Sequence, residues 1–464
     1  MKRIIGIIAL CAVLLSMSAC KKEEEKANTT EETGVKSEVK LLDGEKFSMY
    51  IALPTCKSSY VAPEETGDSI VDAIHLRNAL VEEELGVKLD FTVSDRTTSG
   101  TDQQAETDKI RTLIQSGDTT YDAFVHVQHS GMPTLITEKM FVDWNTIPNI
   151  NLEEPWWYSN IERDICYGDK IYLMTGDYNY TTFSNLECLV FNKEMCDELE
   201  LDYPYESVQN GTWTHDKFLA YIKAAGKDIN GDGKIAASDD RMGFGGWYYE
   251  QVPALFSAYG GTSLVRDDDN LPVLAIDTER NYTVIDKMIE IFDNQNTFAE
   301  LKTYSAFEKA FKEGRLLFMD GFLLHAAGLR SAEIDFGIIP FPKLDETQED
   351  YYSRAANVGG FTYIPVTNQN LEKTGLVLES MARHSYDTIT PTYFDKVLTI
   401  KTARDIESEE MITLIKDSAR FTDAGIWSPA SIGAAGKGNT LSSEYASRKD
   451  ALEVEIEALV DLYK

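Results

Sequence analysis

The sequence is poor in the residues and motifs that catalysis and metal binding most often use. It has only six histidines and six cysteines in 464 residues, and none of them stands at the spacing of a metal site. It contains no Gly-x-Ser-x-Gly elbow, no His-Glu-x-x-His, no P-loop and no glycine-rich dinucleotide fingerprint. Carboxylates are so abundant that a catalytic pair could arise by chance, so they do not argue for a hydrolase. These absences favour a protein that is not an enzyme.

Positive charge is also scarce. The chain has 44 Lys and Arg residues against 77 Asp and Glu residues, which gives a net charge of −33. Such a field repels nucleic acid and anionic membrane surfaces, so we expect neither as a direct partner of the folded body. It suits a monomer that binds a neutral ligand or a cation, and the sequence has no signature of an organic cofactor.

No stretch after residue 19 is long and apolar enough to span a bilayer. At the N-terminus, Lys2 and Arg3 precede an apolar run, Ile4 to Leu15, which is shorter than the roughly twenty residues that a spanning helix needs. A secretory signal peptide has this order: positive charge, then an apolar run, then small residues. We therefore expect residues 1–19 to be a signal peptide.

The three residues Ser18-Ala19-Cys20 resemble a lipobox, the motif at which a lipoprotein signal peptidase cuts before a lipid-modified cysteine, although Met17 stands where that motif prefers Leu. The resemblance implies a lipid on Cys20 that anchors the protein at the extracytoplasmic face of the cell membrane. The alternative is ordinary secretion with a chance cysteine. Residues 20–44 are rich in charge and too poor in apolar residues to fold, so we expect a flexible tether.

Strands and helices alternate through the first part of the body, which predicts an α/β fold with a mostly parallel sheet covered on both faces. In such folds the ligand lies beyond the carboxyl ends of the strands, here the loops after Leu53, Val93 and Val127. The predicted strands cover 46–53, 87–93 and 121–127; the predicted helices cover 70–84, where Arg77 interrupts the apolar stripe, and 107–116.

Two extended stretches, 169–192 and 359–366, are expected to cross between two lobes, since a chain of this length rarely forms a single core. Between and after these two stretches, the apolar pattern predicts strands and helices together up to the second stretch and helices alone beyond it. We predict strands at 242–244, 316–319 and 336–339, and helices at 215–225, 252–259, 305–314, 371–383, 407–417 and 443–462.

Three strings in the second half resemble the family 1 extracellular solute-binding proteins, which include the maltose-binding protein. They are Phe-Lys-Glu-Gly-Arg-Leu-Leu-Phe-Met at 311–319, Ile-Asp-Phe-Gly-Ile-Ile-Pro-Phe-Pro at 334–342 and Gly-Gly-Phe-Thr-Tyr-Ile-Pro at 359–365. The family pattern has a helix ending in Phe-x-x-Gly, a strand with a Met, and a Gly-rich crossing strand. Residues 189–193 and 210–214 resemble its Tyr-Asn-Lys strand and its Pro-x-Thr-Trp turn.

The resemblance implies a two-lobed, type II periplasmic-binding-protein-like fold, hinged by crossing strands, that closes on a ligand. It places an N-terminal lobe at residues 45–176 and 360–384 and a C-terminal lobe at 177–359 and 385–464. It also implies the binding component of an ABC importer, which captures a carbohydrate, an oligosaccharide, and delivers it to the permease subunits. The alternatives are a secreted glycan-acting hydrolase or lyase, and a binder of a non-sugar solute such as a peptide.

The loop from 228 to 239 follows the spacing of an EF-hand-type calcium loop, with side-chain oxygens at positions 1, 3 and 5, glycine at 6, a backbone carbonyl at 7 and a carboxylate at 12. Asp closes it where sensor proteins carry Glu, which resembles the dockerin version. We expect a structural calcium ion; the alternative is a polar turn without an ion. The ligands would be Asp228, Asn230, Asp232, the Lys234 carbonyl and Asp239.

Sugar pockets combine aromatic faces with a few placed polar groups. The resemblance places stacking aromatics at Trp247, Tyr248 and Trp427, although Trp247 could instead belong to the core, and it places Asp320 and Phe322 where the family often has a Trp. Polar candidates follow a strand end or lie in the first crossing, namely Gln128, His129, Asp177, Tyr180 and Thr181. We expect Arg354 to be a solvated surface residue and the pair Trp156-Trp157 to pack on a lobe surface.

Four cysteines, Cys56, Cys166, Cys188 and Cys196, remain after removal of the signal peptide and lipidation of Cys20. They allow three disulfide pairings, and their spacing does not choose among them. A fully reduced set is the fourth alternative, and the one that we favour.

The lipid prediction has a direct test. Replacing the acceptor, Cys20→Ala, removes the thiol to which the lipid would be joined, so the protein should move from the membrane fraction to the soluble fraction. Fractionation followed by immunoblotting measures this, with Cys11→Ala, inside the apolar run, as the matched control that should stay membrane-bound. Retention of the Cys20→Ala protein in the membrane fraction would contradict the lipid anchor.

Overall fold

The computed structural model describes residues 42–464, apart from 234, 237, 293–297, 302, 330–332, 356–358, 395–405 and 422–440. The predicted signal peptide, Cys20 and nearly all of the tether lie outside the described residues, as do Lys234 and Trp427. Within the part that is described, no helix is long and apolar enough to cross a membrane.

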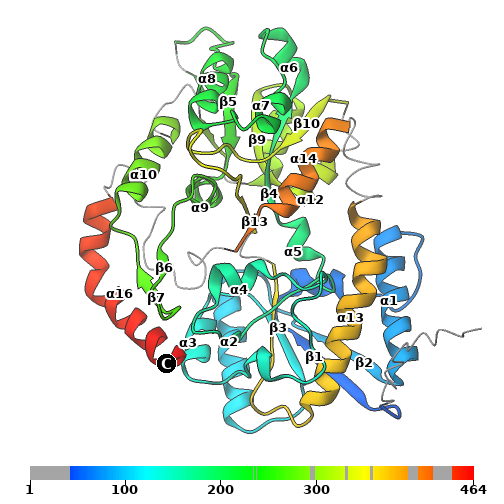
Figure 1. Ribbon diagram of the computed structural model, residues 1–464. Coiled ribbons are helices and arrows are strands. Elements are labelled where there is room, and N and C mark those ends of the chain that lie inside the picture. The colour runs from blue at the N-terminus through cyan, green and yellow to red at the C-terminus, as the bar shows by residue number, and fades with distance from the viewer. Residues whose placement is uncertain are drawn as a thin grey trace, which may run out of the picture. The chain divides into compact units, whose positions relative to one another are not determined.

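The first sheet has the strand order β12-β3-β1-β2 (Figure 1). Strands β1, β2 and β3 run parallel, with Met49 of β1 paired to Phe91 on one side and to Ala123 on the other, and β12 closes the sheet antiparallel to β3. This confirms the predicted α/β architecture for this part of the chain. The four strands are β1 (Lys46–Ile51), β2 (Lys88–Val93), β3 (Ala123–His126) and β12 (Phe361–Tyr363).

The helix α1 (Ser69–Leu85) shows why the local sequence predicts its bounds well. The Asp68 carboxylate accepts hydrogen bonds from the backbone N–H groups of Ile70 and Val71, which caps the first turn. Gly86 ends the helix in a left-handed conformation, with φ of 63°, that glycine adopts without strain. The next helix, α2 (Gly100–Gln115), begins seven residues before its predicted start because Ser99 caps it.

Arg77, which interrupts the apolar stripe of α1, is fully buried. Its guanidinium donates to the carbonyl oxygen of Ser59 at 2.8 Å and to the Ser385 hydroxyl at 3.0 Å. Ser385 lies on the long helix α13 (Leu371–Pro391), which packs along α1. Because a buried polar group must find partners, this arginine joins α1, α13 and the end of the short helix η1 (Pro54–Ser59) at one point.

The second sheet has the order β10-β4-β9-β5-β8. The side formed by β9, β5 and β8 is parallel, whereas β4 runs antiparallel to both of its neighbours, β9 and β10. In Figure 1 this sheet and its helices lie above the first sheet. The strands are β4 (Glu187–Asn192), β5 (Met242–Gly246), β8 (Phe298–Glu300), β9 (Leu316–Phe322) and β10 (Phe336–Ile339).

Helices cover this second sheet and bury a separate aromatic cluster against it. Phe318, at the centre of β9, contacts the rings of Trp213 and Phe218 at 5.8 and 5.2 Å between centroids. The helices are α6 (Lys193–Glu198), α7 (Tyr205–Gln209), α8 (His215–Ala225), α9 (Tyr248–Ala258), α10 (Glu279–Phe292), α11 (Tyr304–Lys312), α12 (Leu323–Gly328) and α14 (Ile406–Asp417).

The stretch 169–192, which we predicted to be extended throughout, is not. A short helix, α5 (Thr181–Ser184), interrupts it before β4 begins at Glu187. The Thr181 carbonyl oxygen accepts from the Asn185 side chain, and the Thr181 hydroxyl donates to Asn179. These local side-chain bonds favour a turn over an extended strand, and they explain the difference.

Two small sheets and the last helix complete the body. A short parallel pair, β11 (Ser353–Arg354) with β13 (Ala419–Arg420), lies between the larger sheets, and β6 (Leu264–Arg266) forms a hairpin with β7 (Pro272–Leu274). Helix α16 (Leu441–Tyr463) contacts β7 near its middle and the first lobe at its C-terminal end, where Tyr463 packs on Tyr167. The remaining elements are η1 (Pro54–Ser59), α3 (Met132–Thr137), η2 (Trp144–Thr146) and α4 (Asn160–Ile165).

The four described cysteines are buried and unpaired, in agreement with the reduced alternative. Burial raises the pKa of the Cys56 thiol to about 11, and that of Cys196 to about 12. Thiols held protonated in this way are poor nucleophiles, so these cysteines act as small apolar groups of the cores.

Candidate ligand-binding site

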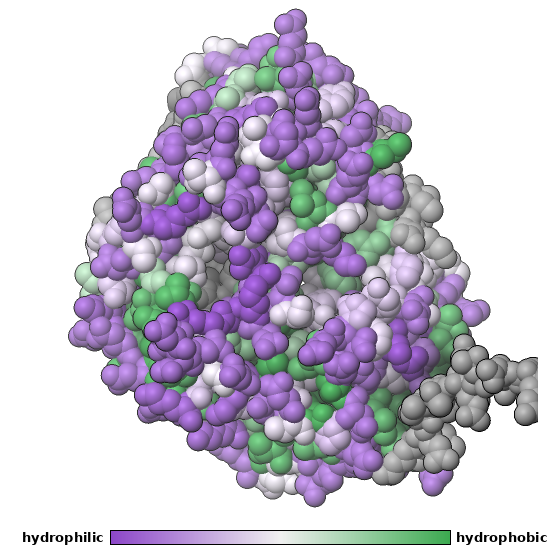
Figure 2. All heavy atoms as spheres, viewed as in Figure 1, coloured by the Kyte–Doolittle hydropathy of each residue, from purple (hydrophilic) through white to green (hydrophobic). Residues whose placement is uncertain are grey.

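Segments of both lobes line a cavity of about 670 Å³ that is open to solvent, which we call the outer cavity. One wall comes from α4, which packs on the first lobe, and the opposite wall comes from the end of α9, β6, α10 and the loop 347–352. Figure 2 shows this face of the molecule hollowed near its middle, with strongly hydrophilic residues around the depression. The lining is Arg163, Asp164, Ser257, Gly260, Gly261, Thr262, Leu264, Val265, Arg266, Arg280, Thr347, Gln348, Glu349, Asp350, Tyr352, Arg420 and Phe421.

A smaller cavity of about 230 Å³, the inner cavity, adjoins it, because Phe421 lines both. Its walls come from the segment 155–160 of the first lobe, from the crossing at 177–186 and from the end of α14. The lining is Pro155, Trp157, Tyr158, Ser159, Asn160, Asp177, Thr182, Phe183, Leu186, Lys416, Asp417, Ala419 and Phe421.

The inner cavity has an aromatic floor. Tyr158 contacts Phe183 with ring centroids 4.7 Å apart and lies nearly parallel to Phe421, at 6.4 Å and 28°. Trp157 is held by the edge of Trp144 at 5.7 Å, and its indole N–H donates to Glu379 of α13 at 3.0 Å. Rings fixed in this way offer flat apolar faces at little entropic cost, which suits stacking on a ring-shaped ligand.

Asp177 is the one predicted contact, among the nine that the structure describes, that lines either cavity. Its carboxyl is buried and accepts from the Thr390 hydroxyl at 2.7 Å. Burial raises the pKa of Asp177 to about 7, against the opposing effects of that hydrogen bond, of the Lys416 charge and of the Tyr158 hydroxyl. Near neutral pH this carboxyl can therefore either donate or accept a hydrogen bond.

Asp164 connects the two lobes at the outer cavity. Its carboxylate accepts from the Arg163 guanidinium at 2.7 and 3.0 Å, from Arg420 at 3.0 Å and from the backbone N–H of Phe421 at 2.9 Å. Hydrogen bonds with a charged partner are stronger than neutral ones. The network therefore holds β13 against α4 and positions the Phe421 ring between the cavities.

The other predicted contacts in the first lobe lie apart from the cavities. Gln128 is buried directly after β3, and burial lowers the pKa of the neighbouring His129 to about 4, so this imidazole is neutral at physiological pH. Tyr180 packs on Tyr393, and Thr181 is buried against Asn179 and Cys56. Direct ligand contact by these four side chains stays a prediction.

The predicted contacts in the second lobe lie at the ends of its strands. Trp247 precedes α9 and is half-buried, whereas Tyr248 is buried against Phe292 with centroids 5.0 Å apart. Phe322 packs on His325, and Asp320 is buried within β9, where burial raises the pKa of its carboxyl. None of the four lines the two cavities, and their roles in binding stay predictions.

The prediction for Arg354 is wrong: this residue is 2% exposed, not a solvated surface residue. Its guanidinium forms an ion pair with Glu187 at the start of β4 and donates to Glu250 of α9 at 2.9 Å. Burial alone would lower the pKa of Arg354, but the two carboxylates raise it, so it stays charged. The pair joins β11 to the second sheet, next to the outer cavity.

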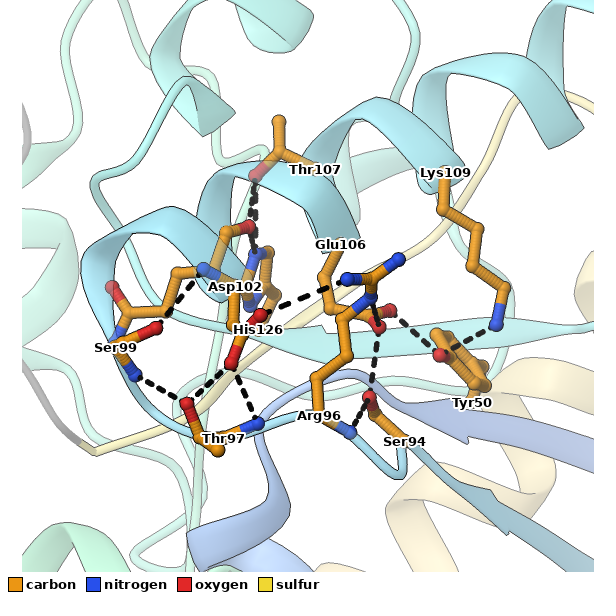
Figure 3. Close-up of polar contacts among 11 residues, drawn as sticks. Tyr50, Ser94, Arg96, Thr97, Ser99, Asp102, Glu106, Thr107, Lys109 and His126 are labelled. Carbon is orange, nitrogen blue, oxygen red and sulfur yellow. Dashed lines mark hydrogen bonds and ion pairs between the residues drawn. The ribbon is translucent and has the colours of Figure 1, made fainter.

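Polar side chains also gather at the carboxyl ends of β1 and β2, where the sequence predicts a ligand. The buried Glu106 carboxylate accepts from the Tyr50 hydroxyl at 2.6 Å and from the Ser94 hydroxyl at 2.8 Å, and Arg96 pairs with it at 3.0 Å (Figure 3). Lys109 in turn donates to the Tyr50 hydroxyl. Because these groups bond to one another, we interpret the network as fixing α2 on the sheet rather than as a binding site.

The predicted calcium loop forms a tight turn between α8 and β5, closed by a bridge between Lys227 and Arg241. The Asp228 carboxylate accepts from the N–H groups of Gly231 and Gly233, at 2.6 and 2.8 Å. Asp240, rather than Asp239, is turned inward and accepts from Ile229 and Ala236. Among the residues that the structure describes, no group of three or more His, Cys, Asp and Glu side chains is placed to hold a metal ion, and calcium stays a prediction.

The sequence profile of the bacterial extracellular solute-binding proteins matches residues 75–379, which is 305 of 464 residues. The chain belongs to this family. Among curated proteins, none matches the sequence. The membership agrees with the resemblance of the strings at 311–319 and 334–342, and it favours a binding protein over an enzyme.

Solved structures similar to this chain share its fold at low sequence identity. UgpB from Mycobacterium tuberculosis, in complex with glycerophosphocholine, has a TM-score of 0.59 at 11% identity, covering 89% of this chain and 99% of that one. A substrate-binding protein from Listeria monocytogenes in complex with cycloalternan has a TM-score of 0.56 at 12% identity. Maltose-bound MalE3 from T. maritima has a TM-score of 0.54, also at 12% identity. Each match covers 89% of this chain and 100% of the other. The two-lobed fold is thereby confirmed.

Of the residues that line the cavities, sequence reasoning predicted only Asp177 as a ligand contact, and it interpreted Trp157 as part of a packing pair on a lobe surface. Tyr158 follows the noted pair Trp156-Trp157, but no local pattern connects it to Phe421, which lies more than 260 residues later. Arg163, Arg266, Arg280 and Arg420 occur singly in a chain full of charge. Basic residues are rarer than acidic ones in this chain, and that was the only sequence signal that these arginines offered. The fold alone brings the four of them to one cavity.

The raised pKa of Asp177 predicts a pH-dependent stability. An aspartate in the unfolded chain has a pKa near 4, so the folded protein binds this proton more tightly, and the free energy of unfolding falls as pH rises from about 4 to about 7. Asp177→Asn removes this loss. The variant should therefore be more stable than the wild type at pH 8, by about 1–4 kcal/mol, and the gain should vanish near pH 4.

Urea unfolding of both proteins at pH 4 and pH 8 measures this difference, and other buried acids cancel in the comparison. Asp417→Asn, at the exposed end of α14, is the matched control and should show no such pH-dependent gain. A stability difference for Asp177→Asn that is the same at both pH values would contradict the assignment.

Proposed function

We propose that this protein is the lipid-anchored, extracytoplasmic binding component of an ABC importer and that it binds a carbohydrate, an oligosaccharide, in the inner and outer cavities. The single observation that carries the proposal is that both lobes line two adjoining cavities with an aromatic floor and polar walls. Ligand pockets typically have roughly 300–1,000 Å³, a range that includes the outer cavity.

The chemistry of the inner cavity supports a sugar. A sugar ring has apolar C–H faces and a rim of hydroxyls, and the inner cavity offers the matching groups: the rings of Tyr158, Phe183 and Phe421, and the carboxyl of Asp177. Several structures of this fold were solved with carbohydrates bound, among them cycloalternan and maltose. A chain of sugar units could extend from the inner into the outer cavity past Phe421.

The proposed anchor fits the same function. A lipid on Cys20 and a tether of about 25 residues would hold the body near the permease and raise its effective concentration there. A binding protein held in this way encounters its transporter by short-range diffusion. The permease subunits are therefore the expected protein partners.

A ligand screen tests the proposal. Purified protein is mixed with neutral oligosaccharides, acidic oligosaccharides and short peptides; binding is measured by thermal shift and calorimetry, and cleavage by thin-layer chromatography. We expect at least one oligosaccharide to bind without being cleaved. Tyr158→Leu should weaken this binding about tenfold or more because it removes a stacking face, whereas Tyr386→Leu, an exposed tyrosine on α13, should not.

The outcomes separate the alternatives. Cleavage of a bound sugar would favour the hydrolase or lyase, and stabilisation by peptides alone would favour a peptide binder. Equal effects of the two tyrosine substitutions would place the ligand elsewhere than the inner cavity. Each of these results would contradict the proposal.

We also propose that the loop 228–239 holds a structural calcium ion. In the loop, Gly231 and Gly233 adopt φ of 76° and 81°, conformations open to glycine, which keeps the turn tight enough for ligands at positions 1, 3 and 5 to converge. Calcium should raise the melting temperature, since it binds only the folded loop, and Asp228→Ala should abolish the rise. Asp268→Ala, in the turn of the β6–β7 hairpin, should leave it intact. No rise with calcium would favour a plain turn.

A further inference from the structure

The outer cavity concentrates positive charge in an acidic protein. Four of the fifteen arginines of the chain line it, although acidic residues outnumber basic ones by 77 to 44 overall. No lysine is among the lining residues. Arginine is the side chain whose planar fork of N–H donors matches the two oxygens of a carboxylate or sulfate. The four are Arg163, Arg266, Arg280 and Arg420.

Two of these guanidinium groups are held by neutral groups. Arg280 donates to the Tyr259 carbonyl oxygen at 2.6 Å and to the Gln348 amide oxygen at 3.0 Å, and Arg266 donates to backbone carbonyl oxygens at 2.7 and 3.0 Å. Carbonyl groups orient a guanidinium without cancelling its charge. Arg280 also forms a long ion pair with Asp345, at 4.0 Å, in which no hydrogen bond joins the two groups and both side chains are open to solvent, so this carboxylate offsets the charge of Arg280 only in part.

The other two guanidinium groups share one carboxylate, that of Asp164. Two positive charges on one negative charge leave an excess of one. Arg420 also lies over the ring of Tyr352, 4.1 Å from its centroid, which orients it without neutralising it. Glu349 and Asp350 complete the charged lining, and both are exposed to solvent, as Arg266 is. With Asp164 they give three acids against four arginines, so the lining keeps a formal charge of +1 in a protein of net charge −33.

The position of Arg280 is built into the fold. Gln348 is 7% exposed, and while its oxygen accepts from Arg280 its nitrogen donates to the carbonyl oxygens of Ala258 and Asp350. Gly260, with φ of 71°, lies beneath the guanidinium, and a Cβ there would be 3.1 Å from its Nη2 atom. Donors held in place in this way lose little entropy when a ligand binds.

We propose that the outer cavity binds an anionic group of the ligand, so that the substrate class is an acidic oligosaccharide, bearing uronate carboxylates or sulfate esters. This inference rests on the proposed function and narrows it. The sugar ring would stack in the inner cavity, and a neighbouring unit would place its anionic group between Arg280 and Arg420. The acidic surface elsewhere opposes this only weakly, because charges beyond about 8–10 Å are screened at physiological salt.

Calorimetry with three ligands of equal length tests the proposal: a neutral oligosaccharide, an oligouronate and a sulfated oligosaccharide. We expect one of the two acidic ligands to bind at least about tenfold more tightly than the neutral one, and this preference to shrink at high salt. Which acidic ligand binds identifies carboxylate or sulfate as the anionic group.

Substitutions then locate the charge. Arg280→Gln should weaken the acidic ligand about tenfold or more and leave the neutral ligand nearly unchanged, because the amide keeps a donor but not the charge. Arg266→Gln, at an exposed position, provides a second test should Arg280→Gln fold poorly. Arg111→Gln, whose partner is Glu138 of the first lobe, is the matched control and should have no effect on either ligand.

The results separate a failure of the acidic-substrate proposal from a failure of the proposed carbohydrate function. A neutral oligosaccharide that binds as tightly as the acidic ones, with no salt dependence, would overturn the acidic substrate and leave the carbohydrate function standing. Equal losses for neutral and acidic ligands on Arg280→Gln would show that the arginine serves only as a hydroxyl donor, which also overturns the proposal. Binding of no sugar at all would overturn the proposed function itself.

Discussion

The carboxylate of Asp164 is the interaction on which the geometry of the candidate site depends. It lies on α4 of the first lobe, and it accepts hydrogen bonds from Arg420 and from the backbone of Phe421, which follow α14 of the second lobe. Because Phe421 lines both cavities, its placement decides where the inner cavity ends and the outer one begins. Separation of the lobes would break these bonds and change the shape of both cavities.

Buried charges recur where segments distant in sequence meet. Arg77 joins α1 to α13, and Arg354 joins β11 to Glu187 of the second sheet. Removing one partner of a buried pair leaves an uncompensated charge, which costs about 3–5 kcal/mol, whereas the intact pair adds little net stability. Such contacts therefore select one arrangement of the segments more than they stabilise it. Here the selected arrangement is the one that brings the crossing segments beside the cavities.

The proposed division of labour between the cavities follows from their walls. The inner cavity has aromatic faces and a carboxyl whose charge is suppressed by burial, which suits a sugar ring. The outer cavity has guanidinium groups held by carbonyl oxygens, which suits an anionic group. A ligand that bridges both would contact the two lobes at once, and its binding energy could then favour the closed state.

The sequence by itself determined the local structure. Asp68 and Gly86 set the ends of α1, and alternation of apolar and polar residues predicted β2. The strings at 311–319 and 334–342 resemble the family to which the chain belongs. Each of these signals acts over a few residues along the chain. Even so, the helix α5 inside a stretch predicted as extended shows that side-chain bonds to the backbone can override such patterns.

Only the tertiary structure decided which residues form the site. Tyr158 and Phe421, or Arg163 and Arg280, are far apart in sequence, and their pairing depends on how the two lobes pack. The periodicity of the sequence does not predict that packing, because the contacts join different helices and strands, whereas periodicity reflects the pattern within one helix or strand. For the same reason we predicted Arg354 to be a surface residue, whereas it is buried. Its partner Glu187 lies 167 residues earlier in the sequence and on another sheet.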